Sequence, residues 1–415
     1  IIIRIMCGYI FLRSNNKKDH KLIKENIASI ERRGPDETNL VQLENKTMIH
    51  TRLSIVDLNN GHQPMNIINN NNSYWIIFNG EIYNYLELRK ELSKDYIFKT
   101  KSDTEVLLAA YIVWGESCLK KINGMYSFLI ISNKNEEIFC ARDITGQKPL
   151  YYSFKEDQIV ISSIPIRFDQ KKILSKEAIA DFLINGYLTS NKTILKDVYS
   201  LEPGHFLKIK GNKFKKYNYW KLSNLPSRIN HFNETKTLNK IDNLLESIVN
   251  NYKNQADVPV ALLLSGGIDS SLMFKYLKKN KNSPFCYIFD NQDVNSEVDD
   301  AKFYVKSAKH QVIKAEKINA KYFEYVYGNI FSQPFSDSSA LNTAQLIKEI
   351  SKDFKCAIGG DGSDEIFAGY YERIKHLGSK NFFNFEFLKR LLSQMISRLK
   401  NKFFMKSFFI AGYRY

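Results

Sequence analysis

Two groups of residues have types and spacings that suit catalysis, and the first begins at Cys7. Cys7-Gly8 follows directly on Met6. If Met6 is the initiator, a small residue such as cysteine after it favours removal of the methionine, which leaves Cys7 with a free α-amine. A thiol beside an amine can be activated without a histidine, because the amine serves as the base. A cysteine by itself is more often a small buried hydrophobe, so the prediction of a nucleophile depends on its neighbours.

Several short charged and glycine-containing segments follow Cys7. Taken singly, each is typical of a turn, a helix cap or a surface ion pair. They are Arg33–Glu37, His50–Asp57, Gly61–Met65, Phe78–Asn84, Lys101–Glu105, Ala141–Asp143 and Gly146–Tyr152. Together and in this order they resemble the glutaminase domain of the class II (N-terminal nucleophile) glutamine amidotransferases, over about residues 6–215.

The resemblance implies a division of roles within this domain. Cys7 matches the nucleophile that attacks the glutamine side chain. The side-chain amide of Asn79 and the backbone N–H of Gly80 match the donors to the oxyanion, and losing one such donor typically costs about 3 kcal/mol.

The same resemblance assigns the groups that hold the amino-acid head of glutamine. Arg52 would bind the α-carboxylate as a bidentate pair. Asp103 and Glu81 would bind the α-ammonium. The Arg33–Asp36 turn is expected to support the pocket without contacting glutamine. A guanidinium at one end and carboxylates at the other would reject anything but a free amino acid.

The second group is the loop Ser265–Ser271, with the sequence Ser-Gly-Gly-Ile-Asp-Ser-Ser. It follows an apolar run and precedes a helical pattern, so its small residues let backbone N–H groups approach a polyanion at a helix N-terminus. The lysine of a Walker A loop is absent. The loop resembles the PP-loop of ATP pyrophosphatases, which release pyrophosphate and form an acyl-adenylate.

A second segment, Gly359–Tyr370, supports this interpretation. It follows the expected strand Cys356–Ile358, so its acids would face the same sheet edge as Asp269. By the resemblance, Asp269 and Asp364 match Mg²⁺–pyrophosphate positions, and phosphate oxygens and water would complete the coordination. Pro334–Ser339 is a third matching stretch.

A glutaminase followed by a PP-loop is typical of the glutamine-hydrolysing asparagine synthetases, and the resemblance covers nearly the whole chain. Glutamine-PRPP amidotransferase and glucosamine-6-phosphate synthase share only the first half. The resemblance implies that the β,γ-phosphates of ATP contact the loop and that residues at the strand ends contact the adenosine and the α-phosphate. It also implies that Asp361 lies near β-aspartyl-AMP, at a position where many relatives carry Glu. The loop residues are Ser265, Gly266, Gly267, Ser270 and Ser271, and the strand-end residues are Leu263, Ile288, Gly359 and Gly360.

The implied reaction makes asparagine from aspartate. Glutamine hydrolysis supplies ammonia, which passes to the PP-loop site. There ATP and aspartate form β-aspartyl-AMP and pyrophosphate, with Mg²⁺ as cofactor, and ammonia displaces AMP. Adenylation is needed because a carboxylate is a poor electrophile and AMP is a good leaving group.

The elements that position these residues fall into two domains, 7–220 and 234–415, with a boundary in the aperiodic segment Lys221–Asn233. We expect an α+β Ntn hydrolase sandwich followed by an α/β PP-loop domain with a parallel sheet. In the first domain the expected strands are 74–78, 125–131, 137–142, 158–162 and 206–209, with a turn at 79–81 and a helix over 104–114 capped by Asp103. In the second, strands 258–264, 285–289, 312–313 and 356–358 alternate with helices 237–252, 270–279, 299–309 and 340–351.

Composition limits the class of protein and the cellular compartment that we expect. The 415 residues are 44% hydrophobic and 25% charged, which is ordinary for a globular protein. No apolar run approaches the roughly 18 residues of a membrane span. Five cysteines without C-x-x-C spacing indicate neither a disulfide framework nor a zinc site, so a reducing compartment, the cytoplasm, is expected. The net charge of +16 follows a general preference for lysine, and no nucleic-acid partner is expected. A homodimer is one expected assembly.

The two ends of the chain raise separate expectations. Met6 is expected to be the true start, since Cys7 needs a free amine. The family normally continues well beyond the Gly359–Tyr370 segment, so we expect a truncated gene or a fragment. The stretch Phe382–Phe409 has apolar residues at helical spacing. It is typical of a core helix that lacks its partner, or of a basic amphipathic membrane helix.

Three alternative functions stay open at this point. One is an amidotransferase of the same architecture that acts on another carboxylate, for example in cell-surface sugar synthesis. Another is a glutaminase-only remnant with an inactive synthetase half. The third is a nucleic-acid binder, suggested by the +16 charge alone. Two observations weigh against this third alternative: the chain has no aromatic–basic binding motif, and the PP-loop enzymes that insert sulfur into tRNA do not have this glutaminase domain.

Overall fold

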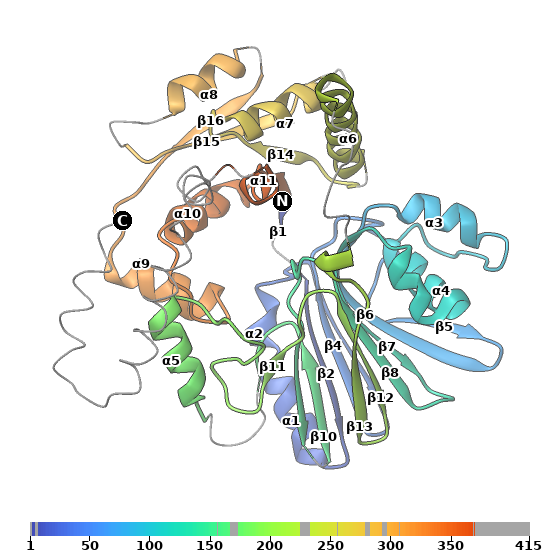
Figure 1. Ribbon diagram of the computed structural model, residues 1–415. Coiled ribbons are helices and arrows are strands. Elements are labelled where there is room, and N and C mark those ends of the chain that lie inside the picture. Colours follow the sequence, from blue (N-terminus) through green and yellow to red (C-terminus); the bar gives the residue numbers. More distant parts are fainter. Residues whose placement is uncertain are drawn as a thin grey trace. The chain divides into compact units, whose positions relative to one another are not determined.

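Figure 1 presents the fold as a computed structural model. It describes residues 2–4, 7–155, 157–166, 173–224, 233–254, 256–278, 283–292, 297–306, 308–367 and 369. Contacts divide the chain into two compact units, Ile2–Gly359 and a unit formed by Ile1 and Gly360–Tyr415. The expected helix at Phe382–Phe409 lies outside the described residues.

The first 220 residues build two six-stranded antiparallel sheets. One has the order β11 (Tyr199–Ser200), β9 (Tyr151–Lys155), β10 (Gln158–Ser162), β2 (Gly8–Ser14), β4 (Lys46–Arg52), β3 (Glu37–Leu43). The other has the order β13 (Lys213–Asn218), β12 (His205–Lys210), β8 (Glu137–Arg142), β7 (Gly124–Ser132), β6 (Asn72–Ile82), β5 (Met65–Asn69). Neighbouring strands pair antiparallel throughout both sheets.

The two sheets pack face to face, and helices cover their outer faces (Figure 1). Tyr9 and Phe11 of β2 share one buried cluster with Leu129 and Ile131 of β7. Outside β2, a second cluster includes Ile23 and Ile30 of α1 (Lys17–Glu25) and α2 (Ala28–Glu31). Outside β6 and β7, a third is formed with α3 (Tyr85–Leu92) and α4 (Asp103–Trp114). The resulting helix–sheet–sheet–helix layering confirms the predicted sandwich.

A third sheet follows with the order β1 (Ile2–Arg4), β17 (Cys356–Ile358), β14 (Val260–Leu263), β15 (Phe285–Asp290), β16 (His310–Lys314). Its last four strands are parallel, whereas β1 pairs antiparallel with β17. One face packs against α6 (Glu234–Asn254), α7 (Ile268–Lys278) and α8 (Val298–Tyr304), and the other against α10 (Ala340–Ile350). A parallel sheet covered on both faces is the α/β layer that the sequence predicted.

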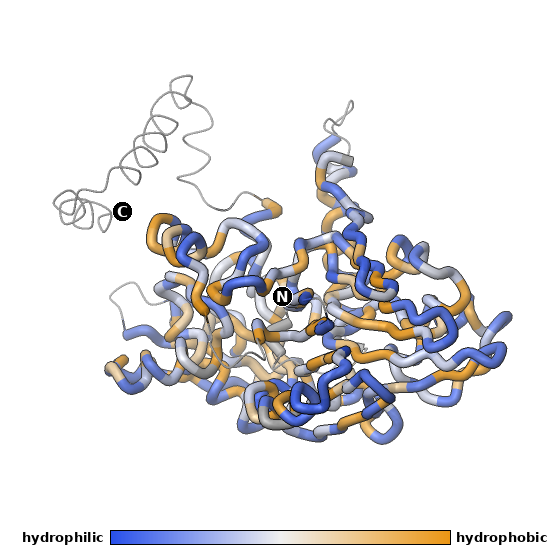
Figure 2. Tube along the Cα trace, turned by 90° about the horizontal axis from the view of Figure 1, so that it is seen from below, coloured by the Kyte–Doolittle hydropathy of each residue, from blue (hydrophilic) through white to orange (hydrophobic). Residues whose placement is uncertain are grey.

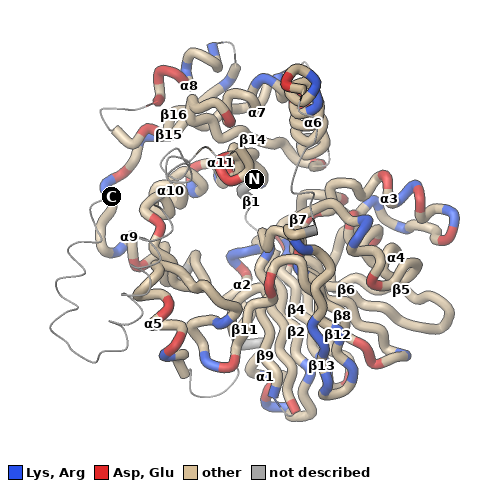
Figure 3. Tube along the Cα trace, in the orientation of Figure 1, with Lys and Arg blue, Asp and Glu red and all other residues tan. Residues whose placement is uncertain are grey.

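The remaining described elements are short or peripheral. They are the 3₁₀ turns η1 (Gly115–Lys120) and η2 (Leu222–Asn224), the helices α5 (Lys176–Asn185), α9 (Ala320–Tyr325) and α11 (Ser363–Phe367), and the π turn η3 (Val326–Ile330). Hydrophobic and hydrophilic stretches alternate along the chain (Figure 2), as expected where each element buries one face. Lys and Arg are spread over many elements with Asp and Glu among them (Figure 3).

Three local predictions were wrong. The expected turn at 79–81 is the continuation of β6, because Asn79, Gly80 and Glu81 pair with residues 125–127 of β7. The expected helix over 299–309 ends at Tyr304. Asp103, expected to cap the helix over 104–114, is the first residue of that helix, and Ser102 is the N-cap.

Candidate active site in the double sheet

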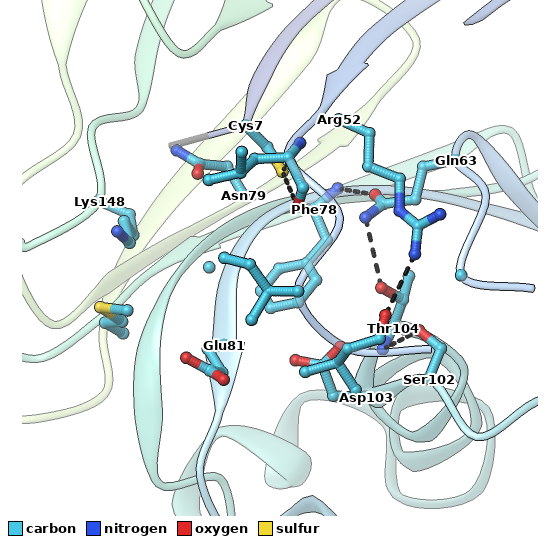
Figure 4. A pocket seen from close by; sticks show the side chains of 16 residues that line it. Cys7, Arg52, Gln63, Phe78, Asn79, Glu81, Ser102, Asp103, Thr104 and Lys148 are labelled. Carbon is cyan, nitrogen blue, oxygen red and sulfur yellow. Dashed lines mark hydrogen bonds between the residues drawn. The ribbon is translucent and has the colours of Figure 1, made fainter. Parts of the chain in front are cut away.

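A pocket in the double sheet brings together every residue that the sequence assigned to glutamine hydrolysis (Figure 4). These residues come from β4, β6 and α4 and from the position just before β2. Those that line the pocket are Cys7, Arg52, Asn79, Gly80, Glu81 and Asp103, with Leu53, Ile55, Val56, Gly61, Gln63, Phe78, Ser102, Thr104, Met125 and Lys148.

Cys7 stands just before β2, and its sulfur and backbone are both held in place. The N–H of Leu53 donates to Sγ at 3.3 Å. Nε of Arg33 donates to the Cys7 carbonyl at 3.2 Å, which agrees with a supporting role for the Arg33 turn. Burial raises the pKa of the Cys7 thiol, while the Leu53 backbone contact and the cations Lys148, Arg52 and Arg33 act to lower that pKa.

Asn79 and Gly80 present hydrogen-bond donors from near the end of β6. The Asn79 side chain is 1% exposed, and its Nδ2 has no hydrogen-bond partner within the described part of the chain. A buried amide without an acceptor is costly, so it indicates a ligand group that accepts from it. Gly80 has φ +155°, and a Cβ there would lie 2.1 Å from the Met125 carbonyl oxygen. Only glycine fits this approach.

Arg52 is fixed by backbone carbonyls of the loop that follows it. Its Nη2 donates to Asp57 O at 2.7 Å and to Val56 O at 3.1 Å, and Nη1 donates to Leu58 O at 3.2 Å. Nη1 also lies 3.8 Å from a carboxylate oxygen of Glu37. The guanidinium is therefore oriented before any substrate arrives.

The two carboxylates of the pocket are both buried. Glu81 is 1% exposed and lies on β6, and Asp103 is 5% exposed and begins α4. Asp103 was predicted to be the N-cap, but Ser102 takes that role by accepting from the Thr104 N–H at 3.0 Å. Because Ser102 caps the helix, the Asp103 carboxylate is directed to the pocket, where its Oδ2 accepts from the Ile82 N–H at 3.1 Å.

Residues that the sequence did not assign also line the pocket. Gln63 accepts from the Phe78 N–H at 2.7 Å through Oε1 and donates to Thr104 Oγ1 at 3.3 Å through Nε2. Gly61 lies against Arg52, and Lys148 is buried in the pocket wall. Gly61, Gln63 and Lys148 all fall in segments that the sequence singled out, but only the tertiary structure places their side chains or backbone at this site.

The Ser265–Ser271 segment follows β14 and continues into α7, which begins at Ile268. Ser265 Oγ lies 3.1 Å from Ser270 Oγ and accepts from the Gly267 N–H at 3.2 Å. Gly266 has φ +95°, and a Cβ there would lie 2.8 Å from the Glu297 carbonyl oxygen. The loop is thus closed on itself at the N-terminus of an eleven-residue helix, whose first turn carries Asp269.

The other predicted nucleotide residues belong partly to the parallel sheet and partly to the second compact unit. Leu263 ends β14, and Ile288 is fully buried in β15 beside it. Gly359 follows β17 and ends the first compact unit. Gly360, Asp361 and Asp364 belong to the second unit, where the Gly369 N–H donates to Asp364 O at 3.0 Å. The predicted metal pair Asp269 and Asp364 is therefore divided between the two units.

Comparison with known proteins finds a family match for each half of the chain. A glutamine amidotransferase domain model matches residues 6–220, and an asparagine synthase model matches residues 240–412. The chain is 34% identical over 383 residues to asparagine synthetase (glutamine-hydrolyzing) 1 of Bacillus subtilis (strain 168), covering 88% of this chain and 59% of that protein. It is 30% identical over 405 residues to "Putative asparagine synthetase (glutamine-hydrolyzing) 2" of Methanocaldococcus jannaschii, covering 89% and 76%.

Two further comparisons complete these findings. Asparagine synthetase (glutamine-hydrolyzing) 3 of Bacillus subtilis (strain 168) is 28% identical over 395 residues, covering 88% of this chain and 63% of that protein. The solved structure of glutamine PRPP amidotransferase from B. subtilis with ADP and GMP is 16% identical, covers 81% of this chain and 70% of that chain, and has a TM-score of 0.40.

The double sheet with its cysteine pocket falls within the glutamine amidotransferase domain matched over residues 6–220, and an α/β sheet follows it. The chain belongs to the family of glutamine-hydrolysing asparagine synthetases. It spans 59%, 76% and 63% of the lengths of the three relatives named. Within the described residues, no helix is long and apolar enough to cross a membrane.

Proposed function

We propose that this protein makes asparagine from aspartate and ATP, using ammonia released from glutamine. The observation that carries the proposal is the pocket of Figure 4, where a cysteine, an oriented guanidinium and two buried carboxylates meet an amide donor that has no acceptor among the described residues. These groups complement the reacting carboxamide and the charged head of glutamine. The family membership supports the second half of the reaction.

In the glutaminase half, the thiolate of Cys7 attacks the side-chain carboxamide carbon of glutamine. Asn79 Nδ2 and the Gly80 N–H donate to the oxyanion of the tetrahedral intermediate. The C–N bond then breaks, and the proton taken from the thiol leaves with the nitrogen as ammonia. Water hydrolyses the thioester to give glutamate and restore the thiol. Arg52 binds the α-carboxylate, and Glu81 and Asp103 bind the α-ammonium.

In the synthetase half, the β-carboxylate of aspartate attacks the α-phosphate of ATP and releases pyrophosphate. Ammonia then attacks the β-carbonyl of the aspartyl-adenylate and displaces AMP. We assign the β,γ-phosphates to the N–H groups and hydroxyls of the loop, the adenosine and α-phosphate to Leu263, Ile288, Gly359 and Gly360, and a place beside the adenylate to Asp361. Support comes from the closed loop at the α7 N-terminus.

Asp269 and Asp364 are the residues that would hold Mg²⁺. The fit rests on chemistry: carboxylate oxygens are the ligands Mg²⁺ prefers, and the loop places Asp269 in the first turn of α7, where phosphates would bind. The ion would neutralise phosphate charge as pyrophosphate departs.

We further propose the two-domain division 7–220 and 234–415, a cytoplasmic location and a homodimer. All five cysteines are free, and four of them are buried, which suits a reducing compartment. Size-exclusion chromatography with light scattering tests the assembly.

One assay tests the proposed reaction. The purified chain is given glutamine alone, and separately ATP, labelled pyrophosphate and a series of carboxylates. Glutamate release together with aspartate-dependent ATP–pyrophosphate exchange supports the proposal. ATP–pyrophosphate exchange that depends on another carboxylate favours an amidotransferase with a different acceptor. Glutaminase activity without any exchange favours a remnant whose synthetase half is inactive. Absence of glutamate release under all conditions would contradict the assignment of the pocket.

A further inference from the structure

Lys148 lies in the wall of the glutaminase pocket, and no role has been assigned to it so far. Its residue is 4% exposed, and it lines the same pocket as Cys7 (Figure 4). A lysine is rarely buried to this extent unless its ammonium meets an anionic or polar group. We therefore ask which anionic or polar group in the pocket stabilises the buried ammonium of Lys148.

The backbone of Lys148 is held on both sides by the residues of one motif. Its N–H donates to Asp143 Oδ2 at 3.0 Å. Its carbonyl accepts from Arg142 Nε at 2.8 Å. The backbone N–H and the backbone carbonyl of Lys148 are thus both fixed by Arg142-Asp143. The sequence singled out this segment but assigned it no function.

The rest of this turn is equally well held. Asp143 is fully buried and also accepts from the N–H groups of Gln147 at 2.9 Å and Tyr126 at 3.2 Å. Arg142 Nη2 donates to Gly146 O at 2.7 Å. A turn fixed at so many points cannot carry Lys148 away from the pocket without breaking buried hydrogen bonds, so the lysine is preorganised.

Both cations and carboxylates surround Cys7. The cations are Lys148, Arg52 and Arg33, and the carboxylates that share the pocket are Glu81 and Asp103. Arg52 is engaged by three loop carbonyls, and Arg33 donates to the Cys7 carbonyl. Among the residues that the structure describes, no histidine lines this pocket. Of the cations, Lys148 has the largest lowering effect on the pKa of the Cys7 thiol.

We propose that the ammonium of Lys148 is the electrostatic partner of the Cys7 thiolate, and that the Arg142-Asp143 turn exists to place it. Lys148 is then a positioning residue that acts through Cys7. When the thiol gives its proton to the base, the negative sulfur lies in the field of the ammonium, which favours the thiolate; no bond to Lys148 forms. This inference rests on the proposed glutaminase function, and it also makes a claim about the thiol alone.

The experiment measures the rate at which iodoacetamide alkylates Cys7 as a function of pH, read by mass spectrometry of the Cys7 peptide. It compares the parent chain with Lys148→Met, which keeps an unbranched side chain, and with Lys148→Arg, which keeps the charge. In Lys148→Met we expect the midpoint to move up by about 1 pH unit, with alkylation roughly tenfold slower at neutral pH. Lys148→Arg should stay near the parent. Lys90→Met, which removes an exposed lysine of α3 outside the pocket lining, should change nothing.

The pH profile of kcat/KM for glutamine should move in the same direction by the same amount. An unchanged alkylation midpoint in Lys148→Met would overturn the proposal, as would a Lys148→Arg variant that shifts as far as Lys148→Met. A lysine that only pairs with Glu81 would instead raise KM without moving the midpoint. If Lys148→Met does not fold, Lys148→Gln replaces it. Alkylation needs no turnover, so a parent chain without glutaminase activity refutes the proposed function and still tests Lys148.

Discussion

Gly61 lies directly against the guanidinium of Arg52, so that a Cβ atom on residue 61 would stand 2.3 Å from Nη2 of the arginine. The same Cβ would lie 3.0 Å from Asp57 O and 3.1 Å from Val56 O, two of the carbonyls that hold the guanidinium. The absence of a side chain at residue 61 is thus what lets Arg52 take its place in the pocket.

Gly61→Ala is therefore expected to weaken glutamine binding by displacing Arg52. Loss of one charge-assisted contact to the α-carboxylate is worth about 1.5–3 kcal/mol, so KM should rise roughly 10- to 100-fold with little change in kcat. Steady-state glutaminase kinetics measure this. The matched control is Gly328→Ala, where a Cβ meets nothing within 4 Å. A KM equal to that of the parent would show that Arg52 does not bind substrate in this position.

Asn79→Ala should reduce kcat for glutamine hydrolysis about 10²- to 10³-fold with a small change in KM, because the amide acts on the oxyanion. Its Nδ2 makes no hydrogen bond within the described chain, so the variant should lose at most about 1 kcal/mol of unfolding free energy. Asn72 is the control on the same strand.

The Asn72 side chain is buried, donates to Ser132 Oγ at 2.8 Å and accepts from the Lys134 N–H at 2.9 Å. Asn72→Ala should therefore lower the unfolding free energy by about 1–3 kcal/mol and leave kcat unchanged. Urea unfolding and kinetics on both variants separate the two roles. The oxyanion assignment fails if Asn79→Ala loses stability and keeps its kcat.

The imidazole of His50 predicts how stability depends on pH. It is fully buried on β4, and its Nε2 lies 3.1 Å from Phe78 O, so Nε2 carries the proton of the neutral ring. Burial lowers the pKa of His50 to about 4, with the Phe78 carbonyl acting in the opposite direction. The unfolded chain has a histidine pKa near 6.5 and therefore binds more protons between these values.

The unfolding free energy should accordingly fall as the pH drops from about 6.5 to 4, by up to about 3 kcal/mol from this residue. His50→Gln should remove that part of the slope, as measured by urea unfolding at a series of pH values. His310 is exposed, and His310→Gln should leave the slope as it is. If the unfolding free energy falls between pH 6.5 and 4 by the same amount in His50→Gln and in the parent, the assignment of a buried neutral imidazole is contradicted.

The α-amine of Cys7 gives a further prediction. A chain whose first residue is Cys7 should hydrolyse glutamine at least tenfold faster than one that retains residues 1–6, because only a free amine can serve as the base. Intact-mass measurement identifies the first residue of each preparation. Full glutaminase activity in a chain that retains Ile1–Met6 would refute the free-amine mechanism.

Much of this architecture follows from local patterns. The apolar run before Ser265–Ser271 predicted a strand, a loop and a helix, and the structure has β14, that loop and α7 in this order. Strand 356–358 was predicted to the residue. Apolar runs bounded by glycine and polar residues determine such elements because the signal is carried by neighbours in sequence.

Where local pattern and distant pairing compete, the sequence was misleading. Asn79-Gly80 is typical of a turn, yet pairing with β7 keeps both residues in a strand. Asp103 is a good cap by type, but Ser102, one residue earlier, makes the capping hydrogen bond. In both cases the partner that decides the conformation is set by packing or by a single hydrogen bond, which periodicity does not report.

By itself the sequence predicted the two chemistries that we propose for this protein, because the residue types and their order along the chain indicate them. Only the tertiary structure decided that β2, β4, β6 and α4 converge on one pocket, and that Lys148 and Gly61 belong to it. The reason is physical. A side chain's neighbours across a sheet sandwich are chosen by the burial of whole faces, and that choice depends on residues more than a hundred positions apart, such as Cys7 and Lys148.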